Sequence, residues 1–224
     1  MKIQIYGDSL MKAIVVDDNY KYRPLEKPLL AQLQADTGAE IVSRARFGCT
    51  CQKGQIFLQK DLEKGLDCTH ALLEFGGNDC DFDWHAVAAE PDGEHQPHTP
   101  LQQFLDTMTA MAKGLLSAGI KPVLMTLPPL HAQRYLDFIG KCGSDTGSIL
   151  HWLGDVQMIY RWQEMYSGAI VRLADKLDLP LIDVRSHFLQ RRDYSNLIAR
   201  DGIHLTEPGY RLICDQCRAV ITGA

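Results

Sequence analysis

Three short motifs, far apart in the chain, carry side chains that together could perform nucleophilic catalysis. They are Gly7-Asp8-Ser9-Leu10, Gly76-Gly77-Asn78-Asp79 and Asp201-Gly202-Ile203-His204. They supply a serine hydroxyl, a side-chain amide, a carboxylate and an imidazole. Catalysis by a serine uses such groups as nucleophile, oxyanion donor, orienting acid and general base. Each motif alone is common, and it is their combination and order that indicate this chemistry.

The candidate base is His204. A serine hydroxyl is a weak nucleophile until a base removes its proton, and imidazole suits that task near neutral pH. Among eight histidines, His204 lies three residues after Asp201. The carboxylate could therefore hydrogen-bond one imidazole nitrogen and leave the other free for Ser9. Taken alone, the motif would equally fit an Asp helix cap beside an ordinary surface histidine.

Two further positions could stabilise a developing negative charge. The Asn78 amide, at a strand end, is a good oxyanion donor, although Gly and Asn are also the commonest turn residues. Gly48 could offer a backbone N–H with no side chain blocking the approach. Asp8 and Asp79, which adjoin Ser9 and Asn78, are candidate pocket residues.

The elements that must position these residues alternate between strand and helix. Five short apolar runs are expected to be strands covered on both faces: Lys2–Tyr6, Glu40–Ala45, Ala71–Phe75, Pro122–Leu127 and Pro180–Val184. The stretches between and after them are expected to be helical: Leu25–Thr37, Thr50–Gly65, Leu101–Ala118, Ile149–Leu177 with a break at Gly154 or Gly168, and Thr206–Val220.

This alternation predicts an α/β fold, a parallel sheet with helices on both faces. Ligands of such sheets bind outside the carboxyl ends of the strands. Ser9 comes just past the first strand and Asn78 just past the third, so we expect both at the same edge of the sheet. The chain shows no repeats, low-complexity tracts or linkers, and residues 1–224 are expected to form a single domain.

Two stretches break the pattern and are interpreted as loop insertions, Cys80–Pro100 and His131–Ser148. Both follow strand ends that face the predicted site, so they could be pocket walls or a lid, or else solvated excursions of the surface. The first is polar and carries Trp84, which could stack on a sugar or close over an acyl chain. The second supplies Tyr135 and Phe138.

A pocket built from these loops would have a mixed polar and apolar character. It would suit a short acyl group, acetyl to butyryl, on a polar alcohol such as a sugar better than a long lipid tail, which needs a continuous apolar channel. The apolar residues of Leu10–Tyr22 could line an acyl pocket or simply belong to the core.

Composition limits the class of protein and its partners. Hydrophobic residues make up 46% and charged residues 23%, as is ordinary for a soluble globular protein with a sizeable core. The net charge of -5 gives no reason to expect nucleic acid or an anionic membrane as a partner. No apolar run approaches the ~20 residues of a membrane span, and the N-terminus lacks the features of a signal peptide. Seven cysteines without such a peptide indicate reduced thiols and a cytoplasmic location.

No metal or other cofactor is expected. Cys214-Asp215-Gln216-Cys217 has the spacing of a redox or metal pair, but it falls in a helical pattern and no second pair completes a zinc site. A metal site built from His85, His95 and His98 would lack regular ligand spacing. The sequence leaves the oligomeric state open.

The motifs above resemble the four sequence blocks of the SGNH (GDSL-type) hydrolases in order and spacing, over nearly the whole chain. The second block rests on Gly48 alone. The resemblance implies a flavodoxin-like three-layer α/β/α fold and hydrolysis of carboxylic esters. It implies Ser9 as nucleophile, His204 as base and Asp201 as its partner. It also implies an oxyanion hole made of the Ser9 and Gly48 N–H groups and the Asn78 side chain.

The sequence admits other interpretations. A different hydrolase fold uses Gly-x-Ser-x-Gly with the same order of Ser, Asp and His, but here position 11 is Met and the Asp and His are only three apart. The substrate, a small-molecule ester, could also be a lysophospholipid or a thioester. A non-catalytic binding module on the same fold is a further alternative, but such a module has no need of the full set of Ser9, Asn78, Asp201 and His204.

Overall fold

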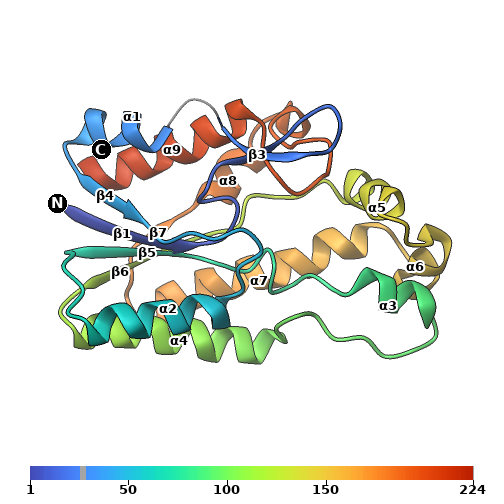
Figure 1. Ribbon diagram of the computed structural model, residues 1–224, viewed down its shortest axis with the longest axis horizontal. Helices are drawn as coiled ribbons and strands as arrows, with labels where there is room; N and C mark the ends of the chain where they lie inside the picture. The colour runs from blue at the N-terminus through green and yellow to red at the C-terminus, as the bar shows by residue number, and fades with distance from the viewer. Residues whose placement is uncertain (26–28, 224) are drawn as a thin grey trace.

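Five parallel strands form the central sheet of the computed structural model, which describes residues 1–25 and 29–223 (Figure 1). Across the sheet they lie in the order β4 (Glu40–Ser43), β1 (Lys2–Gly7), β5 (His70–Glu74), β6 (Lys121–Met125) and β7 (Leu181–Ile182). By position in the chain, the order is second, first, third, fourth, fifth, which is that of flavodoxin-like sheets. The predicted parallel sheet and its five strands are confirmed.

Helices cover both faces of the sheet, as Figure 1 shows. One face carries α1 (Leu29–Thr37), α8 (Val184–Leu189) and α9 (Glu207–Thr222), and the other carries α2 (Cys51–Glu63), α4 (Leu101–Ser117) and α7 (Gln157–Lys176). Three further helices lie beyond one end of the sheet, on the right of Figure 1: α3 (Trp84–Ala89), α5 (Ala132–Lys141) and α6 (Thr146–Leu153). A short 3-10 turn spans Tyr194–Asn196. The fold is therefore three-layered, as expected.

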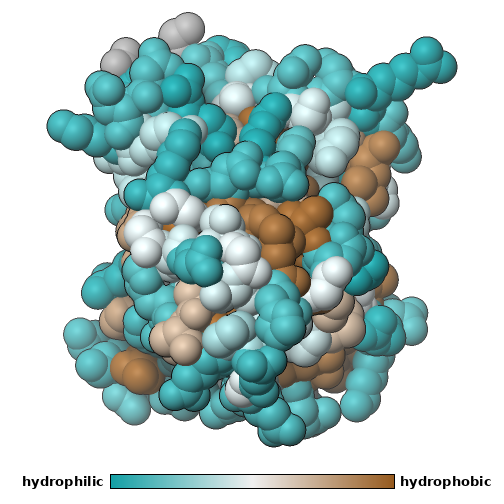
Figure 2. Space-filling view, turned by 90° about the vertical axis from the view of Figure 1, so that its right-hand side faces the viewer, coloured by the Kyte–Doolittle hydropathy of each residue, from teal (hydrophilic) through white to brown (hydrophobic). Residues whose placement is uncertain are grey.

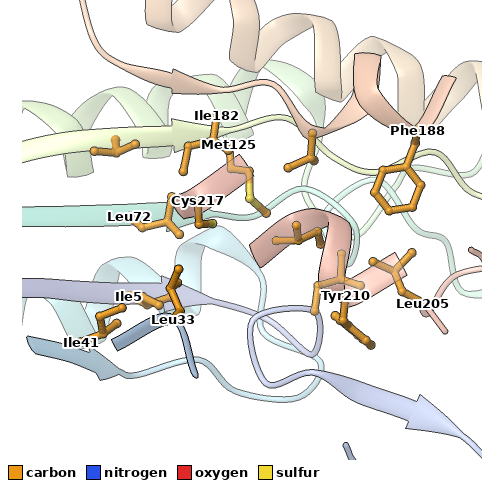
Figure 3. Packing of buried hydrophobic residues seen from close by; sticks show 14 of the residues in the cluster. Ile5, Leu33, Ile41, Leu72, Met125, Ile182, Phe188, Leu205, Tyr210 and Cys217 are labelled. Carbon is orange, nitrogen blue, oxygen red and sulfur yellow. The ribbon is translucent and has the colours of Figure 1, made fainter. Parts of the chain in front are cut away.

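Each face of the sheet has its own apolar core, because successive strand residues point to opposite faces. Ile5 and Leu72 belong to the core beneath α1, α8 and α9, while their neighbours Tyr6 and Leu73 belong to the core above α2, α4 and α7. Figure 3 shows the first core, where strand residues meet Leu33, Phe188, Tyr210 and Cys217 from the helices. Burial on both faces explains why the strands read as continuous apolar runs.

The stretch His131–Ser148, expected to be a loop, is instead mostly helical. It forms α5 and the start of α6, and the buried residues of α5 recur at helical spacing: Ala132, Tyr135, Leu136 and Ile139. The side chain of Asp145 caps α6 by accepting from the backbone N–H groups of Gly147 and Ser148. The predicted break in the following helix falls at Gly154, while Gly168 lies inside α7 without interrupting it.

Three other predictions need adjustment. Cys80–Pro100 is largely irregular, as expected, but contains the short helix α3. The segment after Ser9 forms a small antiparallel hairpin, β2 (Ile14–Val16) and β3 (Tyr22–Pro24), which the sequence pattern did not predict. The helix expected over Leu25–Thr37 is present from Leu29 onward, and residues 26–28 lie outside the described residues. Within the described ranges, no helix combines the length and apolarity needed to cross a membrane.

Candidate active site

The segments that carry Ser9 and Asn78 leave the sheet from neighbouring strands, β1 and β5. The chain goes from β1 outward to β4 on one side, whereas β5 lies on the other side of β1, so the strand order reverses here. Such a reversal leaves a crevice at the carboxyl ends of the strands. The prediction that Ser9 and Asn78 lie at one edge of the sheet is confirmed, because the Asn78 amide hydrogen-bonds Asp8, the residue before Ser9.

Ser9, His204 and Asp201 form one line of hydrogen bonds. The Ser9 Oγ lies 2.9 Å from His204 Nε2, and His204 Nδ1 lies 2.6 Å from Asp201 Oδ2. A carboxylate can only accept, so Nδ1 carries the imidazole proton and Nε2 is left to accept from the Ser9 hydroxyl. All three side chains are buried. The arrangement is that of a nucleophile, a base and a group that orients the base.

The turn from Asp201 to His204 is built around the same carboxylate. Asp201 Oδ1 accepts hydrogen bonds from the backbone N–H groups of Ile203 and His204, at 3.2 and 3.1 Å. Gly202 adopts a φ of +81°, and a Cβ there would lie 2.4 Å from the backbone nitrogen of Tyr135. Only glycine fits, both for its conformation and for the close approach of α5. The two oxygens of Asp201 thus have separate tasks, one holding the turn and one holding the imidazole.

Asp8 lies beneath the site and holds the Asn78 amide. Asp8 Oδ2 accepts from Asn78 Nδ2 at 2.8 Å, and Asp8 Oδ1 accepts from the backbone N–H of Leu10 at 2.8 Å. The backbone N–H of Asp8 lies 3.4 Å from the buried carboxyl group of Glu74. Burial raises the pKa of Asp8 to about 6 and raises the pKa of Glu74 well above its usual value. The structure thus places Asp8 in the site, as a support for Asn78.

Three N–H donors near Ser9 are available to a bound group. Asn78 Nδ2 has two hydrogens, and the one not used by Asp8 has only the carbonyl oxygen of Cys49 at 3.4 Å, a long hydrogen bond. Within the described residues, nothing accepts from the backbone N–H of Ser9 or of Gly48. Gly48 has a φ of +64°, and a Cβ there would meet no atom within 4 Å. The backbone conformation, and not a lack of room for a side chain, therefore favours glycine at this position.

Asp79, expected to be a pocket residue, does not line the cavity. It is fully buried, and both carboxylate oxygens lie 3.0 to 3.1 Å from the backbone N–H of Cys51. Cys51 is the first residue of α2, so Asp79 satisfies a donor at the N-terminus of that helix, where the side chain of Thr50 makes no capping bond. Its role is to tie α2 to the segment that carries Asn78.

A cavity of about 550 Å³ opens beside Ser9 and His204. The chain's three tryptophans all line it, and most of the remaining wall is aromatic or aliphatic. The aromatic lining residues are Tyr22, Phe47, Phe82, Trp84, Tyr135, Phe138, Trp152 and Trp162. Both predicted loop regions supply wall residues, including the predicted Trp84 and Tyr135. The lining is, however, more apolar than the polar sequence of Cys80–Pro100 suggested.

Two rings flank the imidazole at the rim of the cavity. The Tyr22 ring lies 4.9 Å from that of His204 and the Phe47 ring lies 6.0 Å from it, nearly parallel. Phe47 is 52% exposed and Tyr22 is 37% exposed. Figure 2 looks at the side of the molecule where α3, α5 and α6 lie, and apolar residues gather in the middle of this face between hydrophilic ones.

Several cavity residues were missed by sequence reasoning. The ring of Phe82 contacts the rings of Trp152 and Trp162 only in the folded chain. The two tryptophans come from α6 and α7, which the sequence placed in one long helical region. Of the apolar segment Leu10–Tyr22, only Leu10 and Tyr22 line the cavity. The position of two of the three tryptophans, Trp84 inside the first insertion and Trp152 just after the second, was the signal that could have found this wall.

The loop histidines each have a separate partner. His85 bonds the Ser144 hydroxyl, His95 the backbone oxygen of Glu90, and His98 the backbone oxygen of Asn78. Within the part of the chain that the structure describes, no three His, Cys, Asp or Glu side chains gather as metal ligands. The side chain of Cys217 lies in the apolar core with α9, as its helical pattern suggested.

Comparison with known proteins places these observations in a family. The model of the GDSL-like lipase/acylhydrolase family matches residues 5–212, a range that contains Ser9, Asn78, Asp201 and His204. The GDSL esterase/lipase WDL1 of Oryza sativa subsp. japonica is 25% identical over 190 residues, which make up 83% of this chain and 66% of the rice protein. The chain therefore spans just under two thirds of that relative's length.

Solved structures are similar over the whole chain. The lipase/acylhydrolase from Enterococcus faecalis superposes with a TM-score of 0.69 at 17% identity, covering 99% of this chain and 95% of that chain. The acetyl xylan esterase AlAXEase superposes with a TM-score of 0.65 at 20% identity, covering 98% of this chain and 99% of that chain. At such identities the likeness establishes the fold, an α/β fold with a five-stranded parallel sheet flanked by helices.

Proposed function

The chain belongs to the GDSL-like lipase/acylhydrolase family, and on that premise we propose that it is a serine esterase that hydrolyses carboxylic esters through an acyl-enzyme. The observation that carries the proposal is the line of contacts from the Ser9 hydroxyl through His204 to Asp201, at 2.9 and 2.6 Å. These distances lie within the reach that proton transfer needs. An aromatic cavity beside Ser9 gives the ester a place to bind.

The proposed reaction has two halves. In the first, the Ser9 oxygen attacks the ester carbonyl while His204 Nε2 takes the hydroxyl proton, and Asp201 stabilises the imidazolium that forms. The tetrahedral intermediate collapses, the alcohol leaves with the proton from His204, and the acyl group stays on Ser9. In the second half, His204 takes a proton from water as the water oxygen attacks the acyl carbon, and the bond from that carbon to the Ser9 oxygen then breaks while His204 returns the proton to Ser9, which releases the carboxylic acid.

The negative charge on the carbonyl oxygen requires donors that are already in place. The Ser9 and Gly48 N–H groups and the second hydrogen of Asn78 Nδ2 are the candidates, and the Asn78 amide is held from below by Asp8. Such preorganised donors cost no reorganisation when the charge develops. We therefore propose these three groups as the oxyanion hole.

Asn78→Ala is expected to lower kcat by about 10²–10³-fold with little change in KM, because the lost donor acts mainly on the transition state. Steady-state kinetics on a p-nitrophenyl ester, combined with a melting curve, measure both effects. Asn196→Ala, at an exposed asparagine outside the cavity lining, serves as the matched control and should retain full turnover. A loss of melting temperature with unchanged kcat per folded molecule would instead make Asn78 a turn residue only.

The substrate is proposed to be a small ester with a short acyl group. A cavity of about 550 Å³ lies in the range of pockets that enclose a small-molecule ligand, and here it has to take both halves of the ester. The wall offers few polar side chains to sugar hydroxyls, so the sugar alcohol that the polar loop sequence suggested is supported only by ring stacking, as on Trp84. The proposed ester therefore combines a short acyl group with an alcohol that can pack against rings.

In a series of p-nitrophenyl esters, kcat/KM is expected to be highest from acetyl to butyryl and about tenfold lower or more at octanoyl and beyond, since each misplaced methylene costs binding in the transition state. The chain-length profile is read from initial rates at fixed enzyme concentration. An optimum at long chains would favour a lysophospholipase or thioesterase function and would leave the catalytic assignment standing.

A fluorophosphonate probe tests the proposed function against a non-catalytic binding module. Such probes react with serines that a base has activated, so the intact protein should gain one probe mass on the peptide that contains Ser9. The heat-unfolded protein, in which His204 no longer contacts Ser9, is the control and should stay unlabelled. Absence of labelling together with absence of turnover on every ester would leave the binding module as the better proposal.

A further inference from the structure

One carboxylate in its wall gives the aromatic cavity a negative charge. Asp81 Oδ1 accepts from Trp84 Nε1 at 2.8 Å, and Asp81 Oδ2 accepts from the Tyr135 hydroxyl at 2.6 Å. Trp84 and Tyr135 are themselves buried cavity residues. Burial raises the pKa of Asp81, and the two neutral donors act in the opposite direction because their hydrogen bonds favour the charged carboxylate without cancelling its charge.

Positive charge is lacking on the same wall. Among the described residues that line the cavity there is no lysine or arginine, and the other ionisable groups are mainly Asp8, His95 and His204. The guanidinium of Arg185 lies behind the wall, where it donates to the side-chain oxygen of Gln163 and to the backbone oxygen of Leu127, and it is paired with the carboxylate of Glu164. A cleft of low polarity lined by one sign of charge focuses its field on whatever enters.

The rings around Asp81 support one another as a rigid group. The Phe82 ring centroid lies 5.5 Å from that of Trp84, 5.1 Å from that of Trp152 and 5.6 Å from that of Trp162. Aromatic faces carry negative partial charge, and tryptophan attracts a cation most strongly. A quaternary ammonium group has no N–H to donate, so it can bury its methyl groups against the rings without needing hydrogen-bond acceptors. This wall has few such acceptors.

Resting on the esterase function proposed above, we propose that the part of this cavity around Asp81 holds the alcohol half of the ester and selects an alcohol that carries a compact cation, a quaternary ammonium in particular. A neutral alcohol of the same shape binds through apolar contact alone and is disfavoured by comparison. An anionic group, such as a phosphate near the ester bond, faces Asp81 in a poorly solvated wall and is rejected. Among substrates of the same shape, the site therefore prefers a cationic alcohol to a neutral one and a neutral one to an anionic one.

Three probes that share an end with three methyl groups and differ in charge test the inference without any turnover. They are choline, 3,3-dimethylbutan-1-ol and 3,3-dimethylbutanoate, the cation, the neutral analogue and the anion. Because all three tryptophans line the cavity, intrinsic fluorescence reports occupancy directly. Choline is expected to bind the unmodified chain about tenfold more tightly than the neutral alcohol, and the anion is expected to bind most weakly.

Asp81→Asn is expected to bring the choline and neutral-alcohol dissociation constants to within about threefold of each other. The amide is isosteric, and it can still accept from Trp84 and donate to the Tyr135 hydroxyl oxygen. Glu94→Gln is the matched control, because it removes one negative charge from the same segment at an exposed position outside the cavity lining. This control should keep the tenfold preference.

Turnover of butyrylcholine and of 3,3-dimethylbutyl butanoate then separates the two proposals. A higher kcat/KM for the choline ester supports the inference. Equal binding of choline and the neutral alcohol by the unmodified chain overturns it, whatever the turnover and even if Asp81→Asn fails to fold. Charge-selective binding with no turnover of any ester contradicts the esterase proposal and leaves the selectivity of the cavity standing.

Discussion

Ser9→Ala is expected to lower kcat for a short-chain p-nitrophenyl ester by about 10⁶-fold, the size of loss seen when a serine nucleophile is removed from a triad. The Ser9 hydroxyl makes one hydrogen bond, to His204, and alanine differs from serine only by the loss of this hydroxyl. The variant should therefore keep its melting temperature. Turnover measured beside a melting curve, with a stopped assay sensitive enough to detect residual rate, checks both expectations.

Ser117→Ala is the matched control for this variant. Ser117 is exposed at the end of α4, away from the motifs, and its loss should change neither turnover nor labelling by a fluorophosphonate. The small rate expected to remain in Ser9→Ala comes from binding and from the oxyanion donors. A folded Ser9→Ala protein with full turnover would rule out Ser9 as the nucleophile.

Asp201→Asn is expected to reduce kcat by about 10⁴-fold with little change in fold. Two backbone N–H groups, of Ile203 and His204, point at Asp201 Oδ1, so the asparagine must place its oxygen there. Its NH₂ group then faces His204 Nδ1 and can only donate to it. This forces the imidazole proton onto Nε2, the atom that must accept the proton of Ser9. The predicted loss of turnover therefore comes from the wrong imidazole tautomer, and a change of pH should not restore kcat.

Asp183→Asn provides the control for that change. Asp183 also accepts from a backbone N–H three residues on, at Ser186, but it caps α8. Its substitution should leave kcat within about twofold. The assignment of the base can be checked in the same series, with His131→Ala and His187→Ala compared with His204→Ala. If one of the first two abolished turnover and His204→Ala did not, the C-terminal assignment would be wrong.

The strands could be predicted because each is buried on both faces and reads as a short apolar run. Of the helices at the end of the sheet, α5 and the first turn of α6 could not be predicted in this way, since Gly140, Gly143 and Gly147 suggested a loop. In the structure Gly140 lies inside α5 where a Cβ would come 2.8 Å from a methyl group of Thr146, and Gly143 has a φ of +100° just past the helix end. These glycines serve the packing and ending of helices. The helical spacing of the buried residues in α5 was the stronger signal.

The residues proposed for catalysis were accessible to sequence reasoning because each follows a strand of known direction, or forms a local turn as Asp201 and His204 do. The cavity wall was not accessible in this way, because it combines residues of four helices with hairpin and loop residues such as Tyr22 and Phe82, and their relative positions depend on packing across the whole chain. Asp79 shows the limit in one residue. Its neighbour Asn78 faces the site, yet the Asp79 side chain points inward to the N-terminus of α2, and adjacency in sequence does not separate these directions.

The Ser9 to His204 contact joins residues 195 positions apart. Two further contacts join these chain regions: the Tyr210 hydroxyl donates to the backbone oxygen of Ile14, and Arg218 of α9 pairs with Asp36 of α1, the helix that packs against α9 (Figure 1). During synthesis at 5–20 residues per second, the serine is made roughly 10–40 s before its imidazole. A nascent chain on the ribosome therefore carries a serine without its base. The proposed hydrolytic activity begins only when the segment from Asp201 through α9 docks on the rest of the chain, so translation products that stop before it are inert toward the esters around them.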